Sequence, residues 1–409
     1  MIPLPLDLVA ELAPGRLDRA VWADEITGVQ VDSRRIDEGD LFVAIGPGVD
    51  YAKHAFARGA AAVLVPDDAF AALAAIAGAV RDRSSARVVA ITGSMGKTST
   101  KDILGAIADA QLRTVAAERS FNNEIGVPLT LCRLEEDTEL IILEVSMRGF
   151  GQIAELCAFA RPEVGVITMI APVHLEKVGD LEGVIRAKSE LIEALPAGGT
   201  AIVPAGFDIA RDDVTVIRVG EDVTLESFEP PRLVTSLGAT DVSFTARHLA
   251  ANALVAVATA HVLGLELPAR LDVAFAEWRN QEVTLPGGGL LINDAWNANP
   301  ISMRAALEHL TALAGGRRRV AVLGDMAELG SYAEEAHQEV ARAVQEIGVE
   351  VLIAVGPQAR VYGGRSVADA DEAIALLREE LKPGDVVLVK GARALGLECV
   401  ADSLASVSA

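Results

Sequence analysis

The stretch from Val88 to Ser99 has the composition of a loop that binds phosphate. An apolar run leads into glycines and then into Lys97 and Thr98, and a helix is expected to follow. Glycines let the backbone approach an anion, N–H groups at a helix start bind it, a lysine reaches the outer phosphates, and a threonine hydroxyl holds Mg²⁺. Ile91 stands where the general pattern has a further glycine, so the loop differs from that of ordinary P-loop NTPases. The alternative, a plain strand–turn–helix with Gly-Lys-Thr by chance, is disfavoured by the strand before it and the helix after it.

Two further polar residues follow predicted strands near the point where each strand ends. Glu144 comes directly after the apolar run 139–143, and His174 lies four residues after the run 164–170. Ligands of open α/β sheets bind beyond the carboxyl ends of the strands, so both side chains are expected near the phosphate loop. A carboxylate and an imidazole beside a nucleotide indicate a divalent metal, and the phosphates favour Mg²⁺. Each residue alone is equally well explained as a helix cap or a hydrogen-bonded loop histidine.

Lys188 interrupts the apolar face of a helix predicted over residues 181–195. Apolar residues recur there at positions 181, 184, 185, 191, 192 and 195, and position 188 falls on the same face. An ammonium that points inward is costly, so this lysine must lose its proton, meet an anion, reach the surface along its aliphatic stem, or be chemically modified. The pattern leaves these four outcomes open.

The composition excludes several classes of protein. The 409 residues include 36 Lys and Arg against 58 Asp and Glu, which gives a formal net charge of −22 and a pI of about 4.7. Nucleic-acid binding needs a basic surface and is not expected. The apolar run 249–265 is shorter than the roughly 20 residues of a membrane span, and the N-terminus lacks the basic start of a signal peptide. Cys132, Cys157 and Cys399 are widely spaced, so we expect reduced cysteines in a cytoplasmic chain without stable membrane insertion.

The alternation of predicted strands and helices places the chain in the α/β class, with three domains. Residues 1–86 are expected to form a small domain, residues 87–285 a central parallel sheet with crossover helices, and residues 286–409 a third β–α domain. Pro286-Gly-Gly-Gly289 is the predicted linker between the last two. The predicted elements are strands at 29–31, 40–45, 60–65, 87–92, 139–143, 164–170, 290–293, 319–323, 351–355 and 385–389, short strands and turns at 200–245, and a helix at 246–265.

A series of motifs occurs in an order that resembles the Mur ligase family. They are Ile91–Thr98, Phe121–Pro128, Glu144–Ile153, Arg161–Thr168, His174–Glu176 and Arg186–Glu190. Val31–Arg35 and Gly39–Ala44 resemble the family's UDP-binding first domain, while residues 294–300, 324–330 and 389–393 resemble the type that adds D-alanyl-D-alanine. The resemblance implies a small α/β UDP-binding domain, a central P-loop ATPase domain with a parallel sheet, and a C-terminal Rossmann-like α/β domain.

The resemblance also implies an activity. Members of the family join a carboxylate to an amine with ATP, through an acyl phosphate. The expected substrates are UDP-N-acetylmuramoyl-tripeptide and D-Ala-D-Ala, with ATP and Mg²⁺ as cofactors, in peptidoglycan precursor synthesis by a monomer. The alternatives are a sister ligase that adds another amino acid, a catalytically silent nucleotide-binding module, and a simple NTPase switch. Against the first, the Asp-Asn-Pro-Arg motif of the ligase that adds the third residue is not found here.

The family's functional residues carry over to matching positions of this sequence. The expected catalytic residues are Lys97, Glu144, His174 and Lys188, and the expected metal ligands are Thr98, Glu144, His174 and Lys188, the last of which the resemblance implies to be carbamylated. Contacts to ATP are expected at Gly93, Ser94, Gly96, Lys97, Thr98, Ser99, Asn252, Arg279, Asn297 and Asn299. Contacts to the UDP-linked peptide are expected at Ser33, Arg34, Asn122 and Asn123.

Two positions depart from the family's pattern. Trp296 stands where ligases of this type have Tyr, so an aromatic ring is kept and a hydroxyl is lost. Arg279 is matched to an arginine near the end of the central domain, although the residues around it differ from the family's.

Overall fold

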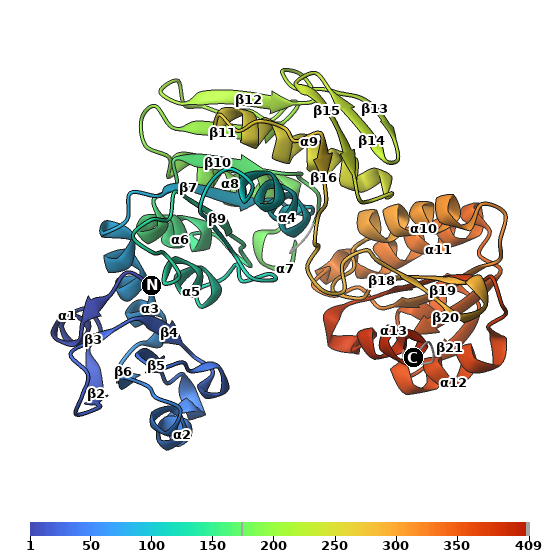
Figure 1. The fold of residues 1–409 in the computed structure, drawn as a ribbon. Coiled ribbons are helices and arrows are strands. Elements are labelled where there is room, and N and C mark those ends of the chain that lie inside the picture. The colour runs from blue at the N-terminus through green and yellow to red at the C-terminus, as the bar shows by residue number, and fades with distance from the viewer. Residues whose placement is uncertain (173–174, 406–409) are drawn as a thin grey trace. The chain divides into compact units, whose positions relative to one another are not determined.

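The computed structural model describes residues 1–172 and 175–405. In this part of the chain, strands alternate with helices (Figure 1), and the strands form five sheets. The predicted α/β class is confirmed. The chain divides into two compact units, of which the first comprises Met1–Ile170, Ile185–Ser243 and Asn252–Val273, and the second comprises Ala171–Val184, Phe244–Ala251 and Ala274–Ala409.

The N-terminal residues build a small mixed sheet. Its strands, in spatial order, are β2 (Gly15–Arg19), β6 (Ala62–Pro66), β5 (Asp40–Val43) and β4 (Gly28–Gln30). Only β2 is antiparallel to its neighbour. The other elements are β1 (Leu4–Pro5), α1 (Leu6–Leu12), β3 (Glu25–Ile26), α2 (Ala52–Ala57) and α3 (Ala69–Asp82). The three strands predicted in this segment correspond to β4, β5 and β6.

The central sheet is parallel throughout. Its strands, in spatial order, are β12 (Thr215–Val219), β11 (Thr200–Pro204), β10 (Val164–Ile167), β7 (Arg87–Thr92), β9 (Leu140–Glu144) and β8 (Thr114–Ala116). The helices of this region are α4 (Lys97–Ala108), α5 (Gly126–Leu131), α6 (Gln152–Ala160), α7 (Leu175–Val178), α8 (Leu181–Glu193) and α9 (Arg247–Val262). Because β7, β9 and β10 are parallel neighbours, the residues that follow them meet at one edge of the sheet.

A second small sheet follows the central one along the chain. It contains β13 (Leu225–Glu229), β14 (Arg232–Thr235), β15 (Gly238–Val242) and β16 (Arg270–Leu271). The short strands predicted at 200–245 and the helix predicted at 246–265 are therefore confirmed, the helix as α9.

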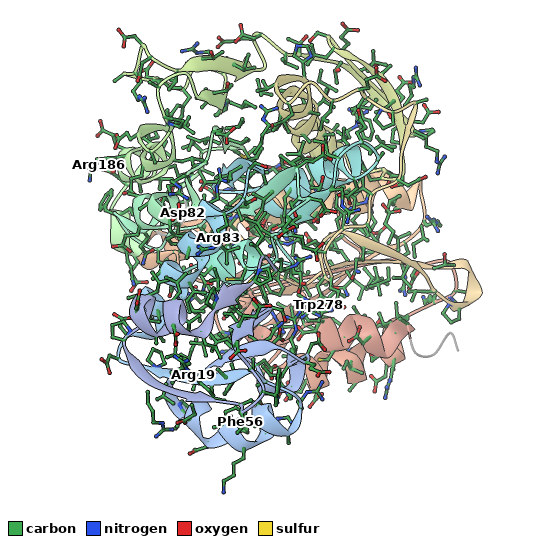
Figure 2. All side chains as sticks on the ribbon, turned by 60° about the vertical axis from the view of Figure 1, so that its left-hand side comes forward. Arg19, Phe56, Asp82, Arg83, Arg186 and Trp278 are labelled. Carbon is green, nitrogen blue, oxygen red and sulfur yellow. The ribbon has the colours of Figure 1, made fainter. Side chains whose placement is uncertain are left out.

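Helix α8 buries one side and exposes the other. Val184, Ala187 and Leu191 are fully buried, whereas Leu181 and Ile185 are 45% and 36% exposed. The predicted buried face is therefore correct at Val184 and Leu191 and wrong at Leu181 and Ile185. Arg186 projects from the outer side (Figure 2), where its guanidinium lies 4.3 Å from the centre of the Phe150 ring.

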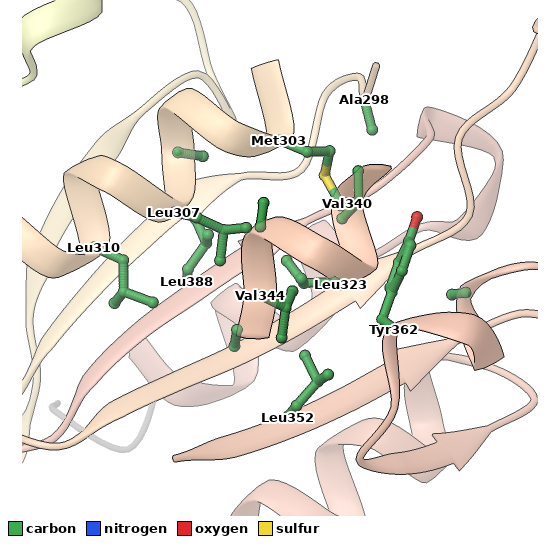
Figure 3. Close-up of a cluster of buried hydrophobic side chains, with 14 of the residues drawn as sticks. Ala298, Met303, Leu307, Leu310, Leu323, Val340, Val344, Leu352, Tyr362 and Leu388 are labelled. Carbon is green, nitrogen blue, oxygen red and sulfur yellow. The ribbon is translucent and has the colours of Figure 1, made fainter. Parts of the chain in front are cut away.

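The C-terminal sheet is covered by helices on both faces. Its strands, in spatial order, are β17 (Gln281–Thr284), β18 (Leu290–Asp294), β22 (Val386–Lys390), β19 (Arg319–Gly324), β20 (Val351–Val355) and β21 (Arg365–Val367). Only β17 is antiparallel. Residues of α10 (Pro300–Ala314) and α11 (Ala333–Ile347) pack on one face (Figure 3), and those of α12 (Ala370–Glu380) and α13 (Glu398–Ala405) pack on the other. This is the arrangement expected of a Rossmann-like domain.

The predicted linker at Pro286–Gly289 is wrong. This segment is the turn that joins β17 to β18, since Thr284 pairs with Leu290 and the Leu285 N–H donates to Gly289 O across 2.8 Å. Proline and glycine favour tight turns for the same reason that they favour linkers. The hairpin spans the predicted boundary between residues 285 and 286, and β17 belongs to the C-terminal sheet. The other predicted boundary, at residue 86, stays a prediction.

The three cysteines differ in their surroundings. Cys132 and Cys157 are buried, and burial raises the pKa of each thiol to about 12. Cys399 is exposed. In the described ranges, we find no helix of the length and apolarity that crossing a membrane would require.

Candidate active site

The phosphate loop joins β7 to α4 at the carboxyl edge of the central sheet. Gly93 and Gly96 have φ angles of +147° and +80°, which L side chains rarely adopt. A Cβ atom at Gly93 would collide with the Thr168 hydroxyl, and one at Gly96 would collide with Oδ1 of Asn252. Both glycines are therefore required by backbone conformation and by close packing.

Hydrogen bonds with the residues directly after the neighbouring strand β10 hold this loop in place. The Thr168 hydroxyl donates to the Met95 carbonyl across 2.5 Å, and the Ser94 N–H donates to the Met169 carbonyl across 2.7 Å. Lys97 Nζ donates to the Gly93 carbonyl across 2.8 Å. The Lys97 ammonium thus lies over the loop.

Glu144 is the last residue of β9, and its carboxylate contacts both Thr98 and Asn122. It is 1% exposed. Its Oε2 accepts a 2.8 Å hydrogen bond from the Thr98 hydroxyl, and its Oε1 accepts a 2.7 Å hydrogen bond from Nδ2 of Asn122. The Ser120 hydroxyl lies 3.3 Å from the Thr98 hydroxyl. Three of the predicted site residues, Thr98, Asn122 and Glu144, are therefore in direct contact.

Lys188 is buried on the inner side of α8, with 2% of its surface exposed. Among residues 1–172 and 175–405, its ammonium has no hydrogen-bond or ion-pair partner. Burial, and then the positive charge of Lys97, lower the pKa of the amine well below its ordinary value. Of the four outcomes open to an inward lysine, those of reaching the surface and of meeting an anion are excluded within these ranges. The neutral amine is also the form that reacts with CO₂.

His174 lies outside the described residues. In the described ranges, no group of three His, Cys, Asp or Glu side chains is arranged to hold a metal. The donors that are present at this edge fit Mg²⁺, because a carboxylate and a hydroxyl are hard oxygen ligands. The Thr98 hydroxyl directs its proton at Glu144, which leaves its lone pairs available to a cation.

The remaining predicted residues of the central sheet fall into two groups. Asn252, on α9, lies against Gly96 and belongs to the phosphate-loop surroundings. Asn123 points elsewhere, because its Oδ1 accepts from the Gly126 N–H across 2.9 Å at the start of α5. Asn123 is thus engaged as a helix cap beside the site.

Ser33 and Arg34 lie in the N-terminal domain. The Ser33 hydroxyl, 5% exposed, is 3.0 Å from Nδ1 of His54, a residue that the sequence did not single out. Arg34 forms a 2.7 Å ion pair with Asp32, and the hydrogen bonds from Arg34 lower the pKa of Asp32 to about 2. For Ser33 and Arg34, the only signal in the sequence was the motif Val31-Asp-Ser-Arg-Arg35.

Asn297 and Asn299 follow β18 in the C-terminal sheet. The Asn297 carbonyl accepts a 2.8 Å hydrogen bond from Nζ of Lys390, which also forms a 2.6 Å ion pair with Asp294. Asn299 caps α10, since its side chain accepts from the Ser302 N–H while the Ser302 hydroxyl accepts from the Asn299 N–H. The sequence signal for this cap is an asparagine directly before a proline at the first helical position.

Trp296 belongs to an aromatic and cationic cluster that the sequence did not reveal. Its ring stacks on that of Trp278 (labelled in Figure 2), with centres 5.9 Å apart and planes inclined by 17°. The Arg393 guanidinium lies 4.6 Å from the centre of the Trp278 ring, and that of Arg279 lies 5.6 Å from the centre of the Trp296 ring. Arg279 therefore lies beside Trp296, while its match to the family's arginine stays a prediction. In the sequence only Trp278 stands next to an arginine, Arg279, and nothing marks its contact with Trp296 or Arg393.

A buried polar network lies in the same unit. His309, 4% exposed, has its Nε2 atom 3.1 Å from Oε1 of Glu282, which also accepts a 2.7 Å hydrogen bond from the Thr245 hydroxyl. The ring of His248 lies edge-on to that of His309, with centres 6.3 Å apart. Burial lowers the pKa of His248 to about 4, an effect that His309 and Lys390 increase and Asp294 opposes.

The fold and this edge of the central sheet are those of a known family of ATP-dependent ligases. The family model for the Mur ligase middle domain matches residues 91–260, and that for the Mur ligase glutamate ligase domain matches residues 278–393. The chain belongs to the Mur ligase family.

Particular members resemble the chain over its whole length. UDP-N-acetylmuramoyl-tripeptide–D-alanyl-D-alanine ligase of Mycobacterium bovis is 35% identical, with 99% of this chain and 98% of the relative covered. The enzyme of the same name from Escherichia coli is 32% identical, with 99% of each chain covered. A crystal structure of MurF from Acinetobacter baumannii has a TM-score of 0.83 and 27% identity, and covers 99% of both chains.

Proposed function

We propose that this chain catalyses the ATP-dependent addition of D-alanyl-D-alanine to UDP-N-acetylmuramoyl-tripeptide, in the synthesis of the peptidoglycan precursor. The observation that carries the proposal is full-length similarity to ligases of that activity in a chain that keeps Lys97, Thr98 and Glu144 at one sheet edge. We place the reaction in the cytoplasm, where ATP is available, and expect the enzyme to act as a monomer.

The two steps of the reaction require concentrated positive charge. A carboxylate is a poor electrophile, so an oxygen of the tripeptide carboxylate first attacks the γ-phosphorus of ATP, ADP leaves, and an acyl phosphate forms. The dipeptide amine then attacks the acyl carbon and loses a proton, and inorganic phosphate leaves. The first step brings two anions together, and the second builds negative charge on a tetrahedral intermediate. Lys97 lies over the phosphate loop, where its ammonium screens the outer phosphates.

We assign the metal-binding role to this same edge. Mg²⁺, when bound, neutralises charge on the phosphates and on the transition state. Thr98 and Glu144 would hold one ion, and Glu144, His174 and modified Lys188 would hold a second. Asn122 fixes Glu144 from the other side by donating to Oε1. A group that orients a ligand in this way tunes its metal affinity.

The modification of Lys188 follows from its surroundings. Its lowered pKa makes the neutral amine available, and the amine nitrogen attacks CO₂, forms an N–C bond and releases a proton. The product is a carbamate anion. A buried anion needs a cation, which a second Mg²⁺ held by Glu144, His174 and the modified Lys188 would supply.

The other predicted residues would contact the two large substrates. Gly93, Ser94, Gly96 and Ser99 would present backbone or hydroxyl groups to the phosphates, with Asn252 on the adenine side. Asn297, Asn299 and Arg279 would serve the nucleotide from the C-terminal domain, and Ser33, Arg34, Asn122 and Asn123 would serve the UDP-linked peptide. We propose that Asn123 and Asn299 act through the backbone that they fix, because their side chains are engaged as helix caps.

A product analysis tests the function. Purified protein is mixed with ATP, UDP-N-acetylmuramoyl-tripeptide and, side by side, D-Ala, D-Glu, a diamino acid or D-Ala-D-Ala, and the products are identified by mass spectrometry. Only the dipeptide should give an amide product, and phosphate release should require both substrates. A preference for a single amino acid would reassign the enzyme to a sister activity, and the absence of any product would favour a silent nucleotide-binding module.

A further inference from the structure

We propose that Lys101 is a positioning residue for the Thr98–Glu144 site, and that it acts through the loop formed by residues 117–123. The inference rests on the proposed function, because it concerns the metal and the UDP-linked peptide of that reaction. Lys101 matches none of the predicted site residues and does not contact Glu144 in the structure.

Lys101 is a buried lysine whose ammonium contacts two backbone carbonyls and one carboxylate. It lies on α4, three residues after Thr98, and is 3% exposed. Its Nζ donates to the Ala117 carbonyl across 2.5 Å and to the Arg119 carbonyl across 3.1 Å, and it forms a 2.9 Å ion pair with Asp102. The ammonium therefore has two backbone hydrogen-bond acceptors and one ion-pair partner.

A comparison with Lys188, the other buried lysine of this region, shows how the partners of Lys101 bear on its role. Both lysines are almost fully buried in the same unit, yet Lys188 has no partner among the described residues whereas Lys101 has three. A buried charge is tolerated when it is paired and hydrogen-bonded. Lys101 is therefore suited to hold the backbone of the loop, while Lys188 is suited to react.

The clamped backbone leads directly into the site. Arg119, whose carbonyl Lys101 holds, has a φ of +47°, a conformation that costs free energy in a residue other than glycine. The next residue, Ser120, places its hydroxyl 3.3 Å from that of Thr98. Asn122 then donates to Glu144 across 2.7 Å. A shift of the Ala117 and Arg119 carbonyls would therefore move Ser120 and Asn122. These two residues contact the Thr98 hydroxyl and the Glu144 carboxylate, the groups assigned to Mg²⁺.

The same loop also reaches the UDP-binding domain. Glu118 lies between the two clamped carbonyls and forms a 2.9 Å ion pair with Arg35. Arg35 directly follows Arg34, a predicted contact to UDP. A single short loop thus carries a contact to each of the two substrate-binding regions of this unit, with Lys101 behind it.

The test compares Lys101→Met with Ile103→Ala in the full chain. Methionine keeps the apolar stem of lysine and removes the three donors. Ile103 is fully buried on the same helix but two positions away, so it points from another face and its truncation weakens packing only. For Lys101→Met we expect the Mg²⁺ concentration for half-maximal activity and the KM for UDP-N-acetylmuramoyl-tripeptide each to rise about tenfold. The KM for D-Ala-D-Ala should stay within about twofold of that of the parent chain.

Two further variants keep the proposal testable if Lys101→Met does not fold. Lys101→Arg, which keeps a cation with several donors, should restore both parameters to within about threefold. Glu118→Gln cuts an exposed tether of the loop, so it should raise the KM for the UDP-linked substrate severalfold and leave the Mg²⁺ dependence unchanged.

Four results would overturn the proposal. The first two are a folded Lys101→Met variant whose Mg²⁺ dependence and KM equal those of the parent chain, and an Ile103→Ala variant in which these two parameters shift as much as in Lys101→Met. The other two are a Lys101→Arg variant that does not restore the two parameters, and a Glu118→Gln variant with the parental KM for the UDP-linked substrate. The parent chain, assayed in parallel, separates this from the proposed function: if it forms no product, the function itself fails, whereas an active parent with unaffected variants refutes only the role of Lys101.

Discussion

The Thr98 hydroxyl donates a 2.8 Å hydrogen bond to Oε2 of Glu144, a residue 46 positions away in the sequence. The two belong to neighbouring strand–loop connections of a parallel sheet, one after β7 and one after β9. The bond joins the helix that follows the phosphate loop, α4, to the carboxylate that ends the neighbouring strand, β9. Nucleotide binding and metal binding are therefore expected to respond together when either residue is changed.

Replacing Lys97 by alanine should abolish most ligation without unfolding the chain. The outer phosphates would lose their direct cation, and loss of such a group costs about 10²–10³ in kcat. The Lys97 ammonium contacts a loop carbonyl on the surface of the site, so unfolding by urea should be nearly unchanged. Phosphate release measures the activity, and near-normal turnover in a folded variant would refute the catalytic role of the loop.

Replacing Lys188 by alanine should also remove activity, but in a way that small molecules restore. The substitution deletes the amine that is proposed to take up CO₂. A short carboxylic acid can occupy the vacated position and supply an oxygen ligand. We expect partial recovery with added acetate or formate and none in Lys97→Ala, which serves as the matched control. Ordinary ligation and ordinary Mg²⁺ dependence in Lys188→Ala would contradict the carbamate.

Replacing Glu144 by glutamine should raise the Mg²⁺ requirement. The amide keeps the shape of the side chain and loses the negative charge that a divalent cation needs. We expect the Mg²⁺ concentration for half-maximal activity to rise at least about tenfold. Removal of metal by a chelator should stop turnover in the parent chain, and added Mg²⁺ should restore it. A parental Mg²⁺ titration in Glu144→Gln would argue against a metal at this edge.

The stacked tryptophans should contribute measurably to the stability of the C-terminal domain. Trp278→Ala removes the stack on Trp296 and the cation–π contact with Arg393, and we expect a loss of about 2 kcal/mol in the free energy of unfolding. Trp296→Tyr keeps an aromatic ring against Trp278 and should cost less than about 1 kcal/mol. Urea denaturation measures both, and equal losses in the two variants would show that stacking is not the cause.

His248 should make the C-terminal unit less stable at acidic pH. Its pKa is about 4 in the folded chain and 6.5 for an ordinary histidine, so below pH 6.5 the unfolded chain binds a proton that the folded chain does not. Stability therefore falls as the pH drops from 6.5 to 4. At one pKa unit per about 1.4 kcal/mol, the loss at pH 4.5 is about 2.5 kcal/mol. His248→Gln should remove this part of the pH dependence in urea denaturation, and identical pH profiles of both chains would disprove it.

The strands were predictable where apolar runs are bounded by polar residues. β7 and β20 occupy the predicted ranges, because in parallel sheets the buried strands read as continuous apolar runs. The convergence of Thr98 with Glu144 was predictable from strand ends alone. Pro286–Gly289 was misjudged because a hairpin turn and a linker have the same composition, and only the pairing of β17 with β18 distinguishes them.

Distant contacts that neither a strand end nor a local period marks could not be predicted. Trp278 and Trp296 stack across two separate segments, and no local period marks their meeting. Lys101 offered no signal because a lysine in a helix is ordinarily solvated, and its burial depends on the path of the loop beside it. In α8 the period was right, yet Ile185 lies too far round the helix to be covered. Periodicity fixes a direction on a helix but not the width of the surface that covers it.

The distribution of thiols offers a single natural attachment point for a reporter. Cys132 and Cys157 are shielded, and their raised pKa values keep them protonated and unreactive, whereas Cys399 is accessible at the start of α13. The pKa of Cys399 is also raised, by partial burial and by the nearby carboxylates of Glu398 and Asp371, so alkylation should proceed cleanly only at mildly alkaline pH. A fluorophore placed there, without mutagenesis, would label the C-terminal domain at one defined position.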